Sequence, residues 1–289
     1  MASSGPADVN TYAALDHGFT IDCDHEELAA WLQLLLRPLR VNDVPETSLR
    51  YELFTQVDTN PGAFRLRVDG ATVWESGHPG QLVTRLVGDI NLRAAERTID
   101  HPVLHAAACG SAAGTLLLPG PKNAGKSTLV LGLALRGFEY LTDELAAIDG
   151  QQVRPYPRCV SLDPGSWPLF EGWQLPTPAS VADFVTDLRF VDAAQTAPIT
   201  SPPREVAAVV CPRYQPGVST QLHTLDPVDG LAALLGSSFT LERNTQRDLD
   251  RLAGLLEHTE SFELIVGSLD EACEVMRQHF GGRGSPSSQ

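Results

Sequence analysis

The chain has 289 residues, of which 43% are hydrophobic and 20% are charged, a composition typical of a soluble globular protein. Its formal net charge of −15 repels phosphate backbones and anionic lipids, so we expect neither nucleic acid nor a membrane as partner. No apolar run approaches the roughly 20 residues that span a bilayer, and the first residues lack the pattern of a signal peptide. The five cysteines are scattered without metal-site spacing, which indicates buried thiols in the cytoplasm.

The first hundred residues predict a small α+β segment. Residues 1–16 are small and polar and are expected to be flexible. Residues 26–36 have the pattern of an amphipathic helix, and residues 82–97 also show helical spacing. Residues 64–68 and 71–74 alternate around Asp69-Gly70, which indicates a β-hairpin. The segment over residues 17–100 carries no chemical motif, so substrate capture, dimerisation and plain packing all remain open for it.

From residue 101 to residue 280 the pattern changes to alternating strands and helices. This pattern predicts an α/β domain with a mixed sheet, followed by a flexible tail over residues 281–289. Residues 175–204 have weak periodicity, which is typical of a lid or a disordered excursion. Strands are predicted at residues 103–109, 115–119, 138–141, 145–149, 206–211 and 262–266, and helices at residues 126–136, 228–236, 246–257 and 269–279.

The only two lysines of the chain, Lys122 and Lys126, lie in one stretch, Gly120–Ser127. This stretch matches G-x-x-x-x-G-K-[ST], the pattern of the phosphate-binding P-loop. An apolar strand precedes it and an apolar helix follows it, so loop N–H groups and the helix N-terminus would point at bound phosphates. We therefore expect ATP to be bound by Gly120, Pro121, Lys122, Asn123, Ala124, Gly125, Lys126, Ser127 and Thr128.

An acidic pair, Asp143-Glu144, follows at the end of a predicted strand. Phosphoryl transfer needs carboxylates near the P-loop to manage Mg²⁺ and the attacking group. Because neighbouring residues of a strand point to opposite sides, one acid would face the metal and the other an incoming hydroxyl. The pattern predicts Ser127, Asp143 and Glu144 as metal ligands, and Lys126 with the two acids as catalytic residues. A turn cap and a solvated glutamate are the alternative interpretation.

Two further features are less specific. His105 lies in an apolar strand just before the P-loop strand, where a histidine is more often a packed core residue than a catalyst. Trp167, Phe170 and Trp173 could line a groove for the acceptor, although buried aromatic side chains are the commoner explanation.

The region around the P-loop resembles the catalytic domain of HPr kinase/phosphorylase, and more closely the HPr-kinase-related kinases encoded beside peptide natural-product genes in bacteria. The likeness covers residues 100 to 280 and is concentrated in residues 101–150. It implies that His105 assists catalysis and that an acid of the pair is the base. The matching stretches are Leu104–Ala107, Gly114–Gly120, Gly120–Ser127, Arg136-Gly137 and Leu141–Glu144.

The chain also departs from this family. The acidic pair is Asp-Glu rather than Asp-Asp, so the sequence leaves open which acid abstracts the proton. HPr kinase carries a Pro-Gly-Arg-Asn motif whose arginine stabilises the transferred charge, whereas the corresponding region here, Leu225–Gly230, has no arginine. Arg213 and Arg158 are the candidate substitutes. The loss of this motif disfavours both the reverse reaction and HPr as the substrate.

The sequence thus predicts a Mg²⁺-dependent kinase with an HPr-kinase-like P-loop domain. It would transfer the γ-phosphoryl group of ATP to a hydroxyl group, a serine or threonine of a peptide or small protein. The alternatives are a kinase of the same fold with a small-molecule acceptor, a P-loop NTPase, and a nucleotide-binding interaction module. The oligomeric state is open, with a homo-oligomer among the alternatives.

Overall fold

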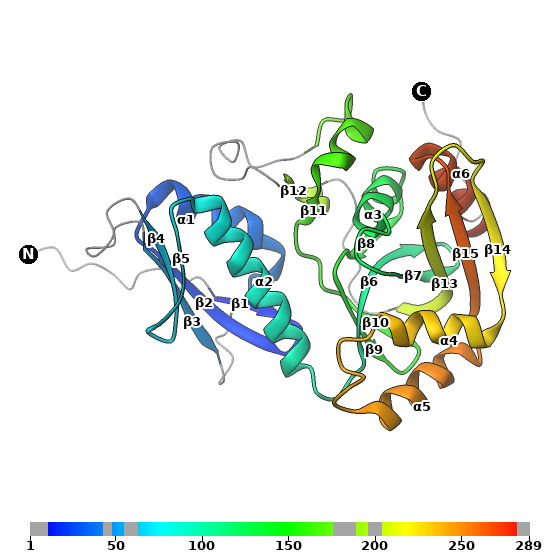
Figure 1. Cartoon of the computed structure of the whole chain (residues 1–289), viewed down its shortest axis with the longest axis horizontal. Helices are drawn as coiled ribbons and strands as arrows, with labels where there is room; N and C mark the ends of the chain where they lie inside the picture. The colour runs from blue at the N-terminus through cyan, green and yellow to red at the C-terminus, as the bar shows by residue number, and fades with distance from the viewer. Residues whose placement is uncertain (1–10, 43–47, 55–62, 176–188, 196–203, 282–289) are drawn as a thin grey trace, which may run out of the picture.

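The computed structural model describes residues 11–42, 48–54, 63–175, 189–195 and 204–281. Two sheets organise these residues, and a two-stranded ribbon lies between them (Figure 1). Among the described helices, none is both long enough and apolar enough to cross a membrane.

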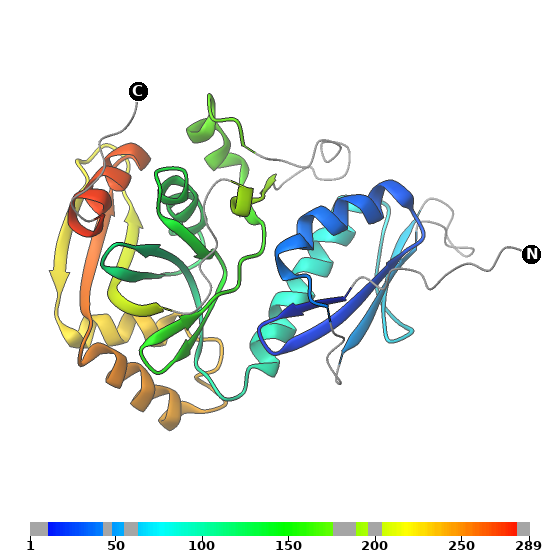
Figure 2. The ribbon, with the colours of Figure 1, turned by 180° about the vertical axis from the view of Figure 1, so that it is seen from behind.

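The smaller sheet and its two helices form what we call the N-terminal unit, residues 11–97. Helices α1 (Glu26–Leu36) and α2 (Pro79–Arg97) pack on the side of this sheet that faces the rest of the chain (Figures 1 and 2). The strands follow the order β1-β2-β3-β4-β5, and they span Thr11–Ala14 (β1), His17–Cys23 (β2), Leu49–Phe54 (β3), Phe64–Val68 (β4) and Ala71–Ser76 (β5).

Helix α1 shows why these residues are helical. The ring of His25 caps its start by accepting a hydrogen bond from the backbone N–H of Leu28. Glu26 and Glu27 in the first turn suit the positive end of the helix dipole. The apolar residues recur at helical spacing, so that one stripe is buried in the N-terminal unit. Its buried members are Leu28, Trp31, Leu32, Leu35 and Leu36.

The larger sheet has eight strands in the order β10-β9-β6-β7-β13-β15-β14, with β8 paired to β6. Strands β7, β13 and β15 run parallel to one another, and the other pairings are antiparallel. The strands span Val103–Ser111 (β6), Gly114–Pro119 (β7), Glu139–Thr142 (β8), Leu145–Asp149 (β9), Gln152–Arg154 (β10), Arg204–Tyr214 (β13), Gln221–Leu225 (β14) and Glu260–Val266 (β15).

Helices cover both faces of the larger sheet. Alternation along β6 sends Ala107 and Cys109 into a core shared with α3 (Lys126–Ala134) and α6 (Leu269–Phe280). Leu104 and Ala106 of the same strand enter the core under α4 (Pro227–Gly236) and α5 (Thr245–Leu256). By the same alternation, His105 lies on the α3 face of the sheet.

The two-stranded ribbon consists of β11 (Val160–Leu162) and β12 (Arg189–Val191). Along the chain, a 3₁₀ segment, Pro164–Phe170, follows β11 and precedes β12. Figures 1 and 2 both show the ribbon between the N-terminal unit and α3. Its Phe190 belongs to the core of the N-terminal unit, whereas Val160 belongs to the core under α3.

The helices and strands predicted from the sequence are present in the structure, with ends that shift by a few residues. The flexible start predicted for residues 1–16 differs from the structure at its end, because Thr11–Ala14 form β1. This short strand pairs with β2 through a tight turn at Leu15, which adopts a left-handed conformation without a glycine to signal it. Residues 1–10, 282–289 and most of the irregular stretch 175–204 lie outside the described residues.

Candidate phosphate-binding site

The loop between β7 and α3 has the strand–loop–helix arrangement that the sequence predicts. Strand β7 ends at Pro119 and α3 begins at Lys126. Gly125 stands just before the helix with a φ of 85°, and Asn123 has a φ of 67°. These left-handed residues curl the chain back over the start of α3, and glycine adopts this conformation without steric cost.

Gly120 leaves room for the lysine stem inside this curl. A Cβ atom at position 120 would lie 3.3 Å from the Cβ of Ala124 and 3.9 Å from the Cδ of Lys126. It would also lie 3.9 Å from the carbonyl oxygen of Pro212 at the end of β13. A Cβ at this position would press on Ala124 and meet the other two groups at ordinary contact distance.

The ammonium group of Lys126 is held inside the loop. Its Nζ donates to the carbonyl oxygens of Gly120 and Pro121, at 2.8 and 2.9 Å. The residue is 5% exposed, and this burial lowers the pKa of Lys126 to about 8, against the opposing influence of Glu144 and Asp143. An ammonium has three N–H groups, of which two are used here. The loop thus concentrates positive charge beside the acidic pair.

The other loop residues differ in how far they are exposed to solvent. Pro121, Lys122 and Asn123 are exposed, whereas Ser127 and Thr128 at the start of α3 are half-buried. Thr128 Oγ1 lies 2.7 Å from Ser166 Oγ, which joins the start of α3 to the 3₁₀ segment. Ala124 and Gly125 are also half-buried, and the N–H of Ala124 donates to the carbonyl oxygen of Pro121.

The two acids have different environments. The side chain of Asp143 is 0% exposed, and donors cover both of its oxygens. Its Oδ1 accepts from the hydroxyl of Tyr140 at 3.0 Å, and its Oδ2 accepts from Arg158 Nη2 and from the N–H of Ser161, both at 3.2 Å. Burial raises the pKa of Asp143, and the charge of Arg158 opposes that rise. Asp143 is therefore an anchor inside the protein.

Glu144 shares the same Arg158 nitrogen but is partly open to solvent, with 29% of its side chain exposed. Its Oε2 accepts from Arg158 Nη2 at 2.9 Å, and its Oε1 lies 3.8 Å from His105 Nε2. Of the two acids, Glu144 is the one whose carboxylate reaches solvent next to Lys126 and His105.

His105 contributes an uncharged ring to this cluster. Burial and the nearby Lys126 lower the pKa of His105, and Glu144 opposes the shift. Its backbone N–H donates to the carbonyl oxygen of Ser237 at 2.7 Å. The ring lies 5.7 Å from the ring of Phe239, an apolar side chain that is 43% exposed at the edge of the site.

Arg158 connects the acidic pair to the ribbon. The residue is 5% exposed, and its Nη1 donates to the carbonyl oxygen of Cys159 and to Ser161 Oγ. Burial disfavours its charge, but Asp143 and Glu144 outweigh burial and raise the pKa of Arg158. Of the two candidate arginines, Arg158 contacts the acids, whereas Arg213 is exposed and pairs with Glu263 at 2.8 Å.

The predicted metal ligands meet this geometry only in part. In the described part of the chain, no three His, Cys, Asp or Glu residues form a group that could hold a metal ion. The oxygens of Asp143 are occupied by protein donors, which leaves the hydroxyl of Ser127 and the carboxylate of Glu144. Mg²⁺ in nucleotide sites keeps several waters and binds phosphates together with one or two protein ligands. Ser127 and Glu144 fit that requirement.

The three aromatic residues singled out in the sequence lie together. Trp167, Phe170 and Trp173 line one hollow, which Arg189 also borders. The guanidinium of Arg189 lies 4.1 Å from the ring centre of Trp167, and Trp173 is 41% exposed. Phe170 is buried in the core under α3, so the aromatic stretch serves both packing and surface.

Sequence reasoning missed two residues of the site, Tyr140 and Ser161. Tyr140 donates to Asp143 and also to the carbonyl oxygen of Arg158 at 2.9 Å. No motif signals either residue, because their roles depend on how β8 and β11 meet in space.

The region Leu225–Gly230 ends β14 and begins α4, where Asp226 caps the helix by accepting from the N–H groups of Val228 and Asp229.

No protein-family model matches this chain, and no curated protein does so either. Among solved structures, the chain is similar to the Hpr(Ser) kinase/phosphatase from Coxiella burnetii, at 11% sequence identity and a TM-score of 0.32. The alignment covers 61% of this chain and 89% of that one. This is a weak likeness between folds.

Proposed function

We propose that this protein is a Mg²⁺-dependent kinase that transfers the γ-phosphoryl group of ATP to a hydroxyl group, a serine or threonine in a peptide or small protein. One observation carries the proposal. The Lys126 ammonium is held inside a glycine-bounded loop and lies close enough to His105 and Glu144 to influence their charges, and Glu144 in turn pairs with Arg158. The loop explains phosphate binding, and the cluster supplies the groups that phosphoryl transfer needs.

The loop binds the triphosphate through charge and backbone N–H groups. The N–H groups at the start of α3 have no partner within the helix, and they favour an anion together with the helix dipole. Lys126 exchanges its loop carbonyls for the β- and γ-phosphate oxygens, which are stronger acceptors because they are charged. This exchange moves an existing ammonium by a short distance and needs no rearrangement of the fold.

The acceptor hydroxyl loses its proton to Glu144. The carboxylate is partly exposed, and Arg158 fixes one of its oxygens. His105 lies beside the other oxygen and stays uncharged, so it does not compete with Lys126 for the carboxylate. Removal of that proton as the phosphoryl group arrives is general base catalysis.

The remaining groups manage charge. Ser127 would hold Mg²⁺ together with the phosphates and water, and the ion would neutralise charge on the β- and γ-phosphates, so that Glu144 stays free to act as the base. Arg158 keeps the carboxylate of Glu144 oriented from the side of the protein core, and Asp143 in turn fixes Arg158.

A hydroxyl acceptor explains one feature that water does not. Phe239 presents an exposed apolar ring beside His105, and its N–H is tied to the carbonyl oxygen of Val103 at 2.8 Å. A rigidly held apolar surface at the mouth of a polar site suits contact with an organic acceptor.

The five free cysteines and the proposed use of ATP agree with a cytoplasmic enzyme.

The test follows the labelled γ-phosphoryl group. The full chain is incubated with Mg²⁺ and γ-labelled ATP, alone, with a pool of serine- and threonine-containing peptides, and with a pool of small polyols. Label in peptide supports the proposal. Label in a polyol would mean that the acceptor is a small molecule instead of a peptide, and label only in inorganic phosphate would indicate an NTPase. Loss of all label transfer in Lys126→Ala ties the reaction to this site. If the wild type shows no heat of binding to Mg-ATP at millimolar concentration, the proposal is wrong.

A further inference from the structure

The short segment Tyr156–Cys159 contacts both the core of the N-terminal unit and the acidic pair of the candidate site. Tyr156 and Cys159 are buried in the core of the N-terminal unit, at 1% exposure each. Arg158, between them, turns the other way and reaches Asp143 and Glu144. The residues next to the site's arginine are thus packed by a unit that carries no chemical motif of its own.

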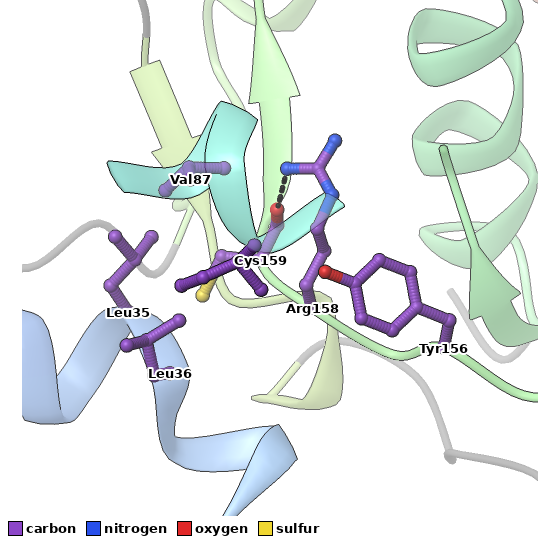
Figure 3. Close-up of a pocket in the computed structure, with 7 residues that line it drawn as sticks. Leu35, Leu36, Val87, Tyr156, Arg158 and Cys159 are labelled. Carbon is purple, nitrogen blue, oxygen red and sulfur yellow. Dashed lines mark hydrogen bonds between the residues drawn. The ribbon is translucent and has the colours of Figure 1, made fainter. Parts of the chain in front are cut away.

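Figure 3 shows how the N-terminal unit holds this segment. Leu35 and Leu36 of α1 and Val87 of α2 lie around Cys159, and all of them line one pocket with Tyr156 and Arg158. A hydrogen bond also joins this segment to α2. The hydroxyl of Tyr156 donates to Asn91 Oδ1 of α2 at 2.8 Å.

A second connection runs through the ribbon. Ser161, whose N–H donates to Asp143, pairs with Phe190 in the register of β11 and β12. The ring of Phe190 stacks edge-on against Trp31 of α1, with 5.8 Å between ring centres. Next to it, Asp192 accepts a hydrogen bond from Arg37 at the end of α1.

The donors that fix the acidic pair therefore depend on the N-terminal unit. Asp143 and Glu144 both accept from Arg158, and Asp143 also accepts from Ser161. Tyr156 and Cys159, on either side of Arg158, and Phe190, the strand partner of Ser161, are buried in the N-terminal core. A shift of α1 or α2 would move these donors, and phosphoryl transfer is sensitive to misplacement of a catalytic group by about 1 Å.

We infer that the N-terminal unit completes the catalytic site by positioning Arg158, and through it Glu144, with Tyr156 and Asn91 as positioning residues. This inference rests on the proposed function for its effect on turnover. It gives the N-terminal unit a role that the sequence left open.

The experiment compares two substitutions of the same kind in the same core. Tyr156→Phe removes the hydroxyl that reaches Asn91 and keeps the ring. Tyr51→Phe is the control, because Tyr51 is also fully buried there, and its hydroxyl contacts Asp89 of α2 at 2.9 Å and His17 at 3.2 Å, neither of which lies in the segment around Arg158. Asn91→Leu removes the same hydrogen bond from its other end. Each full-length variant is examined for thermal unfolding, hydrogen exchange of peptides covering residues 140–162, and kcat and KM for Mg-ATP.

We expect Tyr156→Phe and Asn91→Leu to raise hydrogen exchange in residues 156–162 and to lower kcat by about fivefold to tenfold, with KM for ATP changed by less than about twofold. The kcat of the double variant should be no lower than that of the less active single variant, because both substitutions remove the same hydrogen bond between Tyr156 and Asn91. Tyr51→Phe removes two hydroxyl contacts, so it should lower the unfolding temperature at least as much, and it should leave kcat and the exchange of residues 156–162 unchanged.

The inference is wrong if Tyr156→Phe and Tyr51→Phe behave alike in exchange and in kcat. Its failure is distinguishable from failure of the proposed function. If the wild type neither binds nor turns over ATP, the kinase proposal falls, whereas the exchange data still decide whether the N-terminal unit positions Tyr156–Ser161.

Discussion

Arg158 donates from Nη2 to Oε2 of Glu144 at 2.9 Å. The same nitrogen lies 3.2 Å from Oδ2 of Asp143, so one guanidinium group spans a buried carboxylate and a partly exposed one. This sharing divides the acidic pair into two tasks. Asp143 anchors the arginine in the protein, and Glu144 is the carboxylate that an acceptor can reach.

The two acids should therefore respond differently to neutralisation. Asp143→Asn places an amide among three donors, Tyr140, Arg158 and Ser161, and leaves a buried charge less well paired. We expect it to lower the free energy of unfolding by about 2–4 kcal/mol. Glu144→Gln keeps an oxygen for Arg158 and should change stability by less than about 1 kcal/mol, while turnover falls by about 10²- to 10⁴-fold.

Urea unfolding and label transfer from γ-labelled ATP measure the two effects separately. Glu139→Gln serves as the control for the loss of a negative charge on β8, the strand that leads into the acidic pair, because Glu139 pairs with Arg204 instead of Arg158. The division of tasks is wrong if Asp143→Asn is as stable as the wild type, or if Glu144→Gln retains full turnover.

Arg158 should not be replaceable by lysine. Its guanidinium serves Cys159, Ser161 and the two acids through separate N–H groups in one plane. Lysine keeps the charge but presents a compact ammonium that cannot reproduce this fork. We expect Arg158→Lys to cost about 1–3 kcal/mol of stability and at least roughly tenfold in kcat, and Arg158→Ala to cost about 3–5 kcal/mol. Wild-type kcat in Arg158→Lys would contradict the bridging role.

Much of the architecture could be predicted because its elements are long and periodic. The stripe of buried leucines in α1 and the apolar alternation in β4 give clear signals, and Asp69-Gly70 marks the turn into the exposed strand β5. Strands β11 and β12 have three residues each, too few for any period to show. The edge strand β14 was missed for another reason. Its side chains are mostly exposed, so no apolar alternation marks it.

The candidate site was predictable to the same degree. The loop around Lys126 has a fixed local spacing, and the acidic pair is adjacent in sequence. The different environments of Asp143 and Glu144 could not be predicted, because Arg158 and Ser161 approach from 15 and 18 residues further along the chain. Their approach depends on packing against the N-terminal unit, and sequence pattern does not encode the position of one unit against another.

Stability should fall in mild acid because of His17. Its side chain is buried with the rings of Phe19 and Tyr51, and burial lowers the pKa of His17 to about 4. The unfolded chain then binds a proton near pH 6.5 that the folded chain binds only near pH 4. Stability from this residue is present above pH 6.5 and is lost as the pH falls towards 4, by about 3 kcal/mol in all.

Urea unfolding of the wild type and His17→Gln at several pH values between 7 and 4.5 measures this effect. Acidic residues titrate in the same range, so the difference between the two proteins isolates the histidine. The variant should start less stable and show a smaller decrease with falling pH. Parallel curves for the two proteins would mean that His17 is not buried in its neutral form.

Binding of ATP should take up a proton above pH 8 if Lys126 is the phosphate ligand. The pKa of Lys126 is about 8 in the loop, so the amine is charged at pH 7 and largely neutral at pH 9. Bound phosphates favour the ammonium form, and a neutral Lys126 must gain a proton to bind them. Proton uptake should be near zero at pH 7 and approach one per ATP at pH 9, and the affinity should fall by up to about tenfold for each pH unit above 8.

Titration calorimetry in buffers with different ionisation enthalpies measures this uptake, because the observed heat then changes with the buffer. Lys122→Gln alters the other, exposed lysine of the loop and should keep the uptake. Lys126→Arg carries a permanent charge and should bind more weakly without any uptake. If uptake at pH 9 is the same in Lys126→Arg as in the wild type, the proton goes elsewhere. Since the loop carbonyls of Gly120 and Pro121 hold the ammonium beside Glu144, that result would remove the main support for phosphate binding by Lys126.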